Sequence, residues 1–288
     1  MVTKRDLSLG LLVILLWAFN TVTIKFITLE VEPFTGLALR FLTAVALFAP
    51  FLRRLEKDKF ILIVQISLLL TTLHWGSLIW GIDRLEASTS AILLQTQAIF
   101  SVLIGWVLFK EKIGPKTALG IGISILGVIA IVGIPKETPD MLGVSSILFS
   151  MFTVALAYSR QTLLKDISPT NFIAHIHVIG LLPALAFAFI FETPLETNWS
   201  EINYYILALA ILFQASVVSF SHMLWARLMS RNTMSILPNL TLLLPFFSVF
   251  FAVILLNESL TMSIVIGGLL TTLGVGVIIL RKHKPIEL

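Results

Sequence analysis

The chain has 288 residues, of which 57% are apolar and only 12% are charged, with a mean hydropathy of +0.99 and a formal net charge of +4. A water-soluble domain with so few polar residues could not cover its own surface, so the composition predicts a polytopic membrane protein. Apart from two cations inside apolar stretches, the basic residues lie in the short connections between them, so the net charge predicts no nucleic-acid-binding groove. Cysteine is absent, which excludes disulfides, thiolate metal sites and a cysteine nucleophile.

Ten apolar stretches are long enough to cross a bilayer as helices. Because they continue to the last residues, we expect no cleaved secretory signal and no appended soluble domain. The expected spans are Leu7 to Phe26, Phe34 to Leu52, Phe60 to Gly81, Ala87 to Phe109, Thr117 to Ile134, Met141 to Leu164, Phe172 to Phe191, Tyr204 to Leu228, Thr233 to Leu256 and Met262 to Leu280.

Lys and Arg are distributed unequally between alternate connections. Only Arg84 and Lys136 fall in one set, whereas the other set holds Lys4, Arg5, Arg53, Arg54, Lys57, Lys59, Lys110, Lys112, Lys116, Arg160, Lys165, Arg227, Arg231, Arg281, Lys282 and Lys284. Cytoplasmic loops carry the excess of basic residues, so both termini are expected in the cytoplasm, the last as a short tail over residues 281–288.

The sequence repeats itself with a shift of 147 residues. This shift places Ser101 on Ser248, Glu111 on Glu258, Gly120 on Gly267 and Gly127 on Gly274. Trp17 to Lys25 matches Thr153 to Gln161 only near an offset of 136, which predicts an inserted loop of roughly ten residues around Glu192 to Asn203. Because each half, 1–134 and 141–280, holds five spans, the second must enter the membrane inverted, a feature typical of secondary transporters.

In the first span, Trp17, Asn20, Thr21 and Lys25 share one helical face. A polar face in lipid points inward, which favours a substrate-binding stripe with Lys25 as a carboxylate partner. The alternative is that Trp17 and Lys25 anchor the helix at the membrane interface.

In the second span, Arg40 lies about 9 Å from the start of the helix at 1.5 Å per residue. A cation at that depth needs a partner or water. The candidates are a substrate carboxylate, helix carbonyls, Glu30 or Glu32, and a purely structural tie is the alternative.

In the third span, His74 aligns within one residue of His222 in the inverted half. Two symmetry-related histidines suit substrate binding or proton relay, although each could instead bond a neighbouring helix.

Uncharged polar residues extend this set in later spans. Gln95, Gln97, Gln214 and Asn239 supply donors and acceptors that suit a zwitterion, with interhelical bonding as the alternative. Pro245 interrupts the hydrogen bonding of the ninth span and is a candidate gating residue, with a packing kink as the alternative.

Two acidic residues and four glycines occupy repeated positions. Glu111 and Glu258 lie at equivalent helix ends. There they would either bond across a gate of the transport pathway or simply be exposed to water. The glycines at positions 120 and 127, and at 267 and 274, predict close helix contacts rather than a dimer seam.

Catalysis finds no support in the sequence. His175 and His177 point about 200° apart on a helix, so they cannot chelate one metal, and zincin, P-loop and nucleophile-elbow motifs are absent. We therefore expect no enzyme, no metal and no cofactor. A channel or receptor is a remote alternative.

Several short motifs resemble the EamA branch of the drug/metabolite transporter superfamily. They are Leu15 to Asn20 followed by Lys25, the Leu39-Arg40-Phe41 triplet, Leu94 to Ala98, Lys110-Glu111-Lys112 and Asn257-Glu258-Ser259. The resemblance covers nearly the whole chain and is closest to the amino-acid metabolite efflux type, associated with cysteine-pathway compounds.

We therefore expect an inner-membrane exporter of amino acids or related small metabolites that works by alternating access. The two charged residues inside the first-half spans, Lys25 and Arg40, are both positive, so the expected substrate is a zwitterion or carboxylate. A purine, sugar or lipophilic cation is the alternative. All sixteen acidic residues lie in loops or at helix ends, which favours facilitated efflux, exchange, or proton coupling through histidine. No nucleic acid and no obligatory protein partner are expected.

Overall fold

The computed structural model describes residues 4–110, 112–132, 139–161, 163–164, 167–195, 197–231 and 237–279. Glu111, the tail over residues 281–288 and the side chain of Asn239 lie outside the described residues. Every regular element within the described ranges is a helix, as the composition predicts.

The first half of the chain contains seven α-helices and two short helical segments of other types. They are α1 (Lys4–Glu30), α2 (Pro33–Phe48), η1 (Ala49–Phe51), α3 (Lys57–Ser67), η2 (Leu68–His74), α4 (Trp75–Arg84), α5 (Ala87–Leu94), α6 (Gln97–Phe109) and α7 (Pro115–Val132).

The second half follows a similar order. It contains α8 (Met141–Gln161), α9 (Pro169–Phe191), η3 (Trp199–Glu201), α10 (Tyr204–Leu212), η4 (Phe213–Val218), α11 (Ser219–Arg231), η5 (Leu237–Leu243), α12 (Leu244–Leu256) and α13 (Met262–Ile279). The segment from Glu192 to Asn203, expected to lie in a loop, connects α9 to α10.

Seven continuous helical segments of the described chain are long and apolar enough to cross a membrane. Three further apolar helices, over residues Pro115–Ile131, Leu240–Leu256 and Met262–Ile278, are shorter. Apolar side chains on many of the helices are exposed, among them Leu182 and Phe189 on α9 and Leu209 on α10, which fits a surface in contact with lipid.

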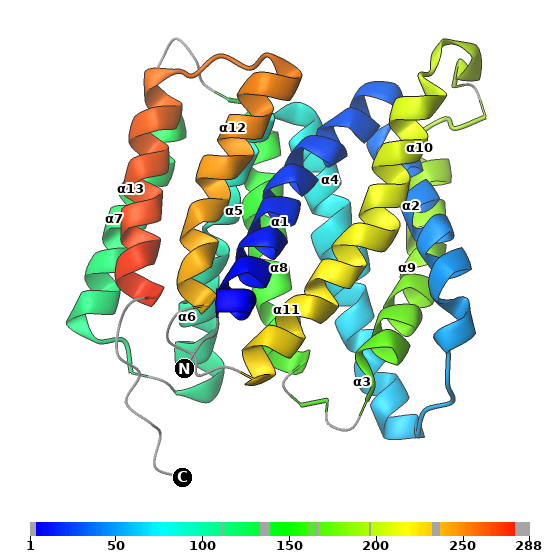
Figure 1. Cartoon of the computed structure of the whole chain (residues 1–288), viewed down its shortest axis with the longest axis horizontal. Helices are drawn as coiled ribbons and strands as arrows, with labels where there is room; N and C mark the ends of the chain where they lie inside the picture. The colour runs from blue at the N-terminus through cyan, green and yellow to red at the C-terminus, as the bar shows by residue number, and fades with distance from the viewer. Residues whose placement is uncertain are drawn as a thin grey trace.

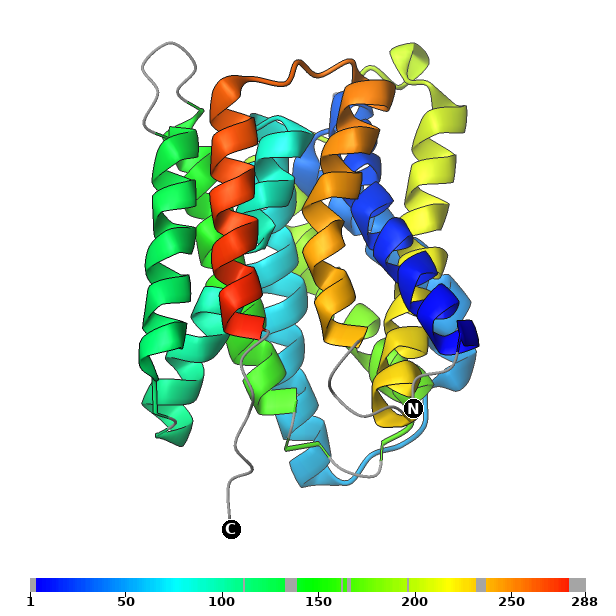
Figure 2. The same cartoon turned by 60° about the vertical axis from the view of Figure 1, so that its left-hand side comes forward.

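The helices form one bundle in which spans that follow one another along the chain run in opposite directions (Figures 1 and 2). We call the end where α1 ends and α2 begins the distal end, and the opposite end, where α1 begins, the proximal end. The largest helix pairings are α7 with α13, α2 with α9, α4 with α8, and α1 with α12. Each of these pairs joins the first half of the chain to the second.

Glycine makes the pairing of α7 with α13 possible. A Cβ atom on Gly120 would lie 2.7 Å from the carbonyl oxygen of Gly274, and one on Gly127 would lie 2.7 Å from that of Gly267. The expected close helix contacts are therefore present, because only glycine lets the two backbones approach this far.

Several spans that the sequence presents as continuous helices are interrupted. The third and eighth spans contain π-helical segments, η2 and η4, and the fourth span is divided at Gln95 and Thr96. Pro245 does not lie in the middle of an α-helix as expected: it lies in the first turn of α12, directly after the 3-10 segment η5. Proline is favoured there because the first helical N–H groups have no partner within the helix.

Helices α6 and α12 end in the same way. Each is capped by a residue with positive φ, Lys110 at 56° and Asn257 at 54°, whose backbone N–H bonds to the carbonyl of Gly105 or Ala252, respectively. Both the caps and their acceptors are 147 residues apart.

Candidate substrate site

Arg40 is the most unusual charged residue in the described bundle. Its side chain is buried, with 4% relative exposure, eight residues into α2. The guanidinium carbon lies 3.4 Å from the ring centroid of Trp75 and 5.3 Å from that of Phe41. Its Nε and Nη1 atoms are buried without a hydrogen-bond partner. Stacking on aromatic rings offsets part of the cost of burying this charge, but leaves its planar donor edge unused.

The acidic residues considered as partners of Arg40 are engaged elsewhere. Glu30 accepts a hydrogen bond from the backbone N–H of Asn203 at 2.7 Å, and Glu32 accepts one from Thr193 at 3.3 Å. The ion pairs found among the described residues do not include Arg40. The structure thus leaves donors on a buried cation available for an anion.

Three histidines surround Arg40 within electrostatic range: His74, His177 and His222. His74 lies at the end of η2, and its Nδ1 is 2.7 Å from Ser150 Oγ on α8. His177, on α9, lies between the rings of Phe41 and Phe48, at centroid distances of 5.7 and 5.9 Å. These contacts bring α2, the third span, α8 and α9 together around one charge.

His222 supplies the accessible side of this cluster. Its ring lies 4.9 Å from Trp17, and Trp17 also contacts Trp225 and donates its indole N–H to Ser221 Oγ at 2.9 Å. His222 is exposed, whereas Arg40, His74 and His177 are buried. Of these four side chains, His222 on α11 is therefore the one that reaches the surface of the bundle.

A second polar group lies where α1 meets η4. The side chain of Gln214 is fully buried, and its Nε2 donates to Thr23 Oγ1 at 2.7 Å and to the carbonyl of Asn20 at 3.2 Å. Gln214 Oε1 and Asn20 Oδ1 are buried acceptors without a partner. Buried acceptors of this kind require a donor, and an ammonium group is one that supplies several.

Helix packing connects the two groups. Ala44, one turn after Arg40, shares a buried apolar cluster with Ala215, the neighbour of Gln214. Since α2 and η4 are in direct contact there, the unused donors of Arg40 and the unused acceptor of Gln214 lie along one helix interface.

The remaining amides have different positions. Gln95 lies at the break between α5 and α6, and its Nε2 is buried without a partner. Gln97 begins α6, which packs mainly on α8, and its backbone carbonyl accepts from Ser101. No contact in the described chain joins Gln97 to Arg40 or Gln214.

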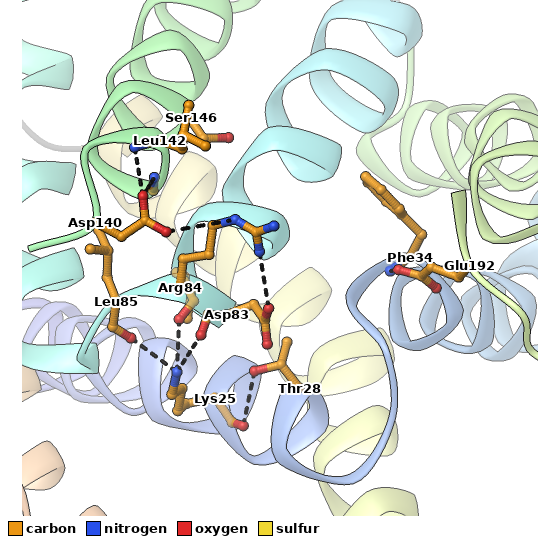
Figure 3. Close-up of polar contacts among 12 residues, drawn as sticks. Lys25, Thr28, Phe34, Asp83, Arg84, Leu85, Asp140, Leu142, Ser146 and Glu192 are labelled. Atoms are coloured by element: carbon orange, nitrogen blue, oxygen red, sulfur yellow. Dashed lines mark hydrogen bonds and ion pairs between the residues drawn. The ribbon is translucent and has the colours of Figure 1, made fainter. Parts of the chain in front are cut away.

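Lys25 is occupied by the protein itself. Its Nζ donates to the carbonyls of Ile82, Asp83 and Leu85 at 3.1, 2.7 and 3.0 Å, as Figure 3 shows. The ammonium therefore caps the C-terminal end of α4, where cations are favoured.

Glu258 caps the N-terminal end of the next helix, α5. Its two carboxylate oxygens accept hydrogen bonds from the N–H groups of Ala87 and Ser88, at 2.6 and 2.9 Å. The turn between α4 and α5 is thus held at one end by an ammonium and at the other by a carboxylate. Pro245, also expected to act in gating, is buried at the start of α12.

Two pockets lie at the distal end of the described residues, and the turn from Arg84 to Glu86 lines both of them. Lys25 and Glu258 line one of them, and Asp140 and Ser259 line the other. Neither pocket includes Arg40, so neither opens onto the central cluster.

Sequence reasoning missed several residues of this cluster. Trp75 and Ser150 carry no pattern that marks them as partners of Arg40 or His74. His177 was considered only as half of a metal-chelating pair, and among the described residues no group of three metal-ligating side chains is found. The signal that could have identified His177 is its position on a helix expected to span the membrane, where a histidine is unusual.

Comparison with known proteins agrees with this architecture. The profile of the EamA-like transporter family matches residues 5–133 and again residues 141–280. The "Probable amino-acid metabolite efflux pump" of Escherichia coli is 26% identical over 99% of both chains, and that of Salmonella typhimurium is 28% identical over 94% of both chains. The "Uncharacterized transporter YoaV" of Bacillus subtilis is 26% identical over 91% of this chain and 92% of its own.

A protein of known crystal structure is similar over 96% of both chains, with a TM-score of 0.64 and 14% identity. That likeness concerns the fold alone. The two family matches cover nearly the whole chain, and the relatives are named as transporters rather than enzymes. The chain is a multi-pass membrane protein and belongs to the EamA-like transporter family.

Proposed function

We propose that this protein exports amino acids or closely related metabolites across the inner membrane by alternating access. The observation that carries the proposal is the buried guanidinium of Arg40, which has unused donors and no ion pair within the described residues. A buried charge is costly unless it is paired. A transport site can tolerate that cost because the substrate supplies the missing partner in each cycle.

The proposed substrate is a zwitterion held at two points. Its carboxylate would bind the donor edge of Arg40, since guanidinium and carboxylate form parallel hydrogen bonds. Its ammonium would bind Asn20 Oδ1 and Gln214 Oε1, which lack donors. His74 and His222, with His177, flank the carboxylate end and are candidates for proton relay.

The proposed architecture is ten spans arranged as two inverted repeats, residues 1–134 and 141–280, with both termini cytoplasmic and the distal end outside. The equivalent left-handed caps at Lys110 and Asn257, and the π segments in the third and eighth spans, support the duplication. The seven long apolar segments and the three shorter ones support a count of ten spans.

The test is binding and counterflow in proteoliposomes with a panel of amino acids, purines, sugars and lipophilic cations. Arg40→Gln is expected to weaken binding of the transported amino acid at least about 100-fold, because a buried charged hydrogen-bond pair is lost. Without ligand, its melting temperature should equal or exceed that of the wild type, because an uncompensated buried charge has been removed. Arg54→Gln, at an exposed loop residue, is the matched control.

Three results would overturn the proposal. If Arg40→Gln lowers the melting temperature without changing ligand binding, Arg40 is a structural tie. If only lipophilic cations bind, the protein is a drug exporter, and substrate-independent conductance would instead indicate a channel.

A further inference from the structure

Helices α2 and α9 form an antiparallel pair that is tied across the two halves at both ends. At the proximal end, the backbone N–H of Arg53 donates to Asn171 Oδ1 at 2.8 Å. Between the ends, Phe41 and Phe48 of α2 contact the ring of His177 on α9. The pair therefore carries both Arg40 and His177.

The distal tie is made by two carboxylates in opposite directions. Glu192, which follows α9, accepts hydrogen bonds from the N–H groups of Phe34 and Thr35 at 2.6 and 2.7 Å, and from Thr35 Oγ1 at 2.8 Å. Glu32, which precedes α2, accepts one from the N–H of Thr193 at 3.3 Å. Figure 3 shows Glu192 beside Phe34 at the start of α2.

Helix α2 depends on this external carboxylate. Its own N-cap residue, Glu32, makes no capping hydrogen bond with its side chain, and Pro33 follows directly. The first free N–H groups of a helix need acceptors, and negative charge is favoured at that end. Glu192 meets both needs from a helix 158 residues further along the chain.

We propose that Glu192 is a positioning residue, whose carboxylate latches α9 to the first turn of α2 and thereby sets the position of Arg40 for the substrate. This inference rests on the proposed function of the Arg40 site. Arg40 lies five residues after Thr35, about 7.5 Å along the same helix, so a shift of the first turn is passed directly to the guanidinium.

The latch also makes the site sensitive to pH at the distal end. Burial raises the pKa of Glu192, the hydrogen bonds from Phe34 and Thr35 oppose that rise, and the neighbouring charge of Glu32 adds to it, so the net direction is upward. In an open latch the carboxylate would be exposed and its pKa would be lower. The closed latch therefore binds a proton more tightly, and acidification favours it.

Other charged groups near this end have partners of their own. Glu30 binds the N–H of Asn203, Glu201 binds Asn198, and Asp83 pairs with Arg84 on α4. On α2 and α9 themselves, the nearest further titratable residues are Arg40 and His177; Glu196 in the loop lies outside the described residues.

The experiment compares wild type with Glu192→Ala, Glu192→Gln and the control Glu201→Gln, whose side chain is bonded within the same loop. Counterflow of the transported amino acid is measured over a range of pH on the distal side, together with hydrogen exchange of α2 in the absence of substrate. Glu192→Ala should raise KM about fivefold, the factor expected for loss of a helix cap, and should speed exchange at Phe34 and Thr35. Glu192→Gln should abolish the acid dependence of transport, and the control should match wild type.

Unchanged KM, pH profile and exchange in both Glu192 variants would overturn the proposal, as would a lower melting temperature with KM and pH profile unchanged. If Glu192→Ala does not fold, the pH profile and exchange of Glu192→Gln decide. Exchange in α2 does not depend on substrate. Two results are therefore separable. If the wild type binds no amino acid but Glu192→Ala exchanges faster than the wild type at Phe34 and Thr35, the proposed substrate is overturned and the latch is supported.

Discussion

The two basic residues inside the first-half spans show how similar sequence signals lead to different structural roles. Both Lys25 and Arg40 were expected to meet a substrate carboxylate. In the structure Lys25 donates to three carbonyls at the end of α4, whereas Arg40 lies on Trp75 with unused donors. The end of a neighbouring helix lies within reach of Lys25 but not of Arg40. That difference depends on how the helices pack and not on the local sequence.

Replacing Lys25 by methionine keeps the apolar stem and removes the donors. The carbonyls of Ile82, Asp83 and Leu85 then lose a charged partner, which costs roughly 2 kcal/mol and should lower the melting temperature by about 5 °C. Lys4→Met, at an exposed residue of the same helix, is the control. An unchanged melting temperature combined with lost transport would restore Lys25 as a substrate ligand.

Gln214 offers a test of the proposed ammonium subsite. Gln214→Leu should weaken binding of the amino acid about tenfold, or about 1.4 kcal/mol, and leave binding of the carboxylate that lacks the amino group nearly unchanged. Comparing two ligands on one variant cancels any general loosening of the contact with Thr23. Gln65→Leu, at an exposed glutamine bonded to Arg160, is the control, and equal loss for both ligands would make Gln214 an interhelical tie.

At the scale of elements, interruptions in helices coincide with the polar groups. His74 ends η2, Gln214 lies in η4, and Gln95 lies at the break between α5 and α6. Such irregular backbone is tolerated inside a membrane protein where it is buried or lines a cavity. The apolar pattern reveals the spans but not these breaks, because hydropathy reports the length of an apolar stretch and not how its backbone is hydrogen-bonded.

The contact between α7 and α13 gives a prediction with a matched control on one helix. A side chain on Gly127 would meet Thr271 and the Gly267 carbonyl, whereas one on Gly122 would meet nothing within 4 Å. Gly127→Leu should therefore lower membrane abundance several-fold, and Gly122→Leu should not. Quantitative immunoblotting of membranes measures both, and equal abundance of the two variants would contradict the tight packing of these helices.

At the scale of the whole molecule, the closest helix pairs cross between the halves. Helix α7 with α13 and α2 with α9 each join one helix from the first half of the chain to one from the second. Because these interfaces are close and tied at several points, we expect the moving bodies of the transport cycle to combine helices of both halves. Rocking of one intact half against the other would break these pairs.

The orientation can be tested by cysteine labelling, since the protein has no cysteine of its own. Lys57 and Asn198 are both exposed. Lys57 begins α3, Asn198 lies in the loop before α10, and Figure 1 shows the start of α3 and the start of α10 at opposite ends of the bundle. In intact cells a membrane-impermeant thiol reagent should label Asn198→Cys and spare Lys57→Cys, because the basic residues gather at the end that holds Lys57. The reverse pattern would invert the proposed topology and with it the distal end of the pathway.

The sequence alone determined the solvent, the helical class, the positions of the apolar segments and the family, because these follow from composition, periodicity and short motifs. It also identified Arg40, His74, Gln214 and His222 as unusual, since polar side chains in apolar spans are individually costly. Only the tertiary structure decided which of them lack partners. Lys25, Glu192 and Glu258 bind backbone groups 57 to 171 residues away, and such pairings depend on how helices from two halves meet, which a single sequence does not encode locally.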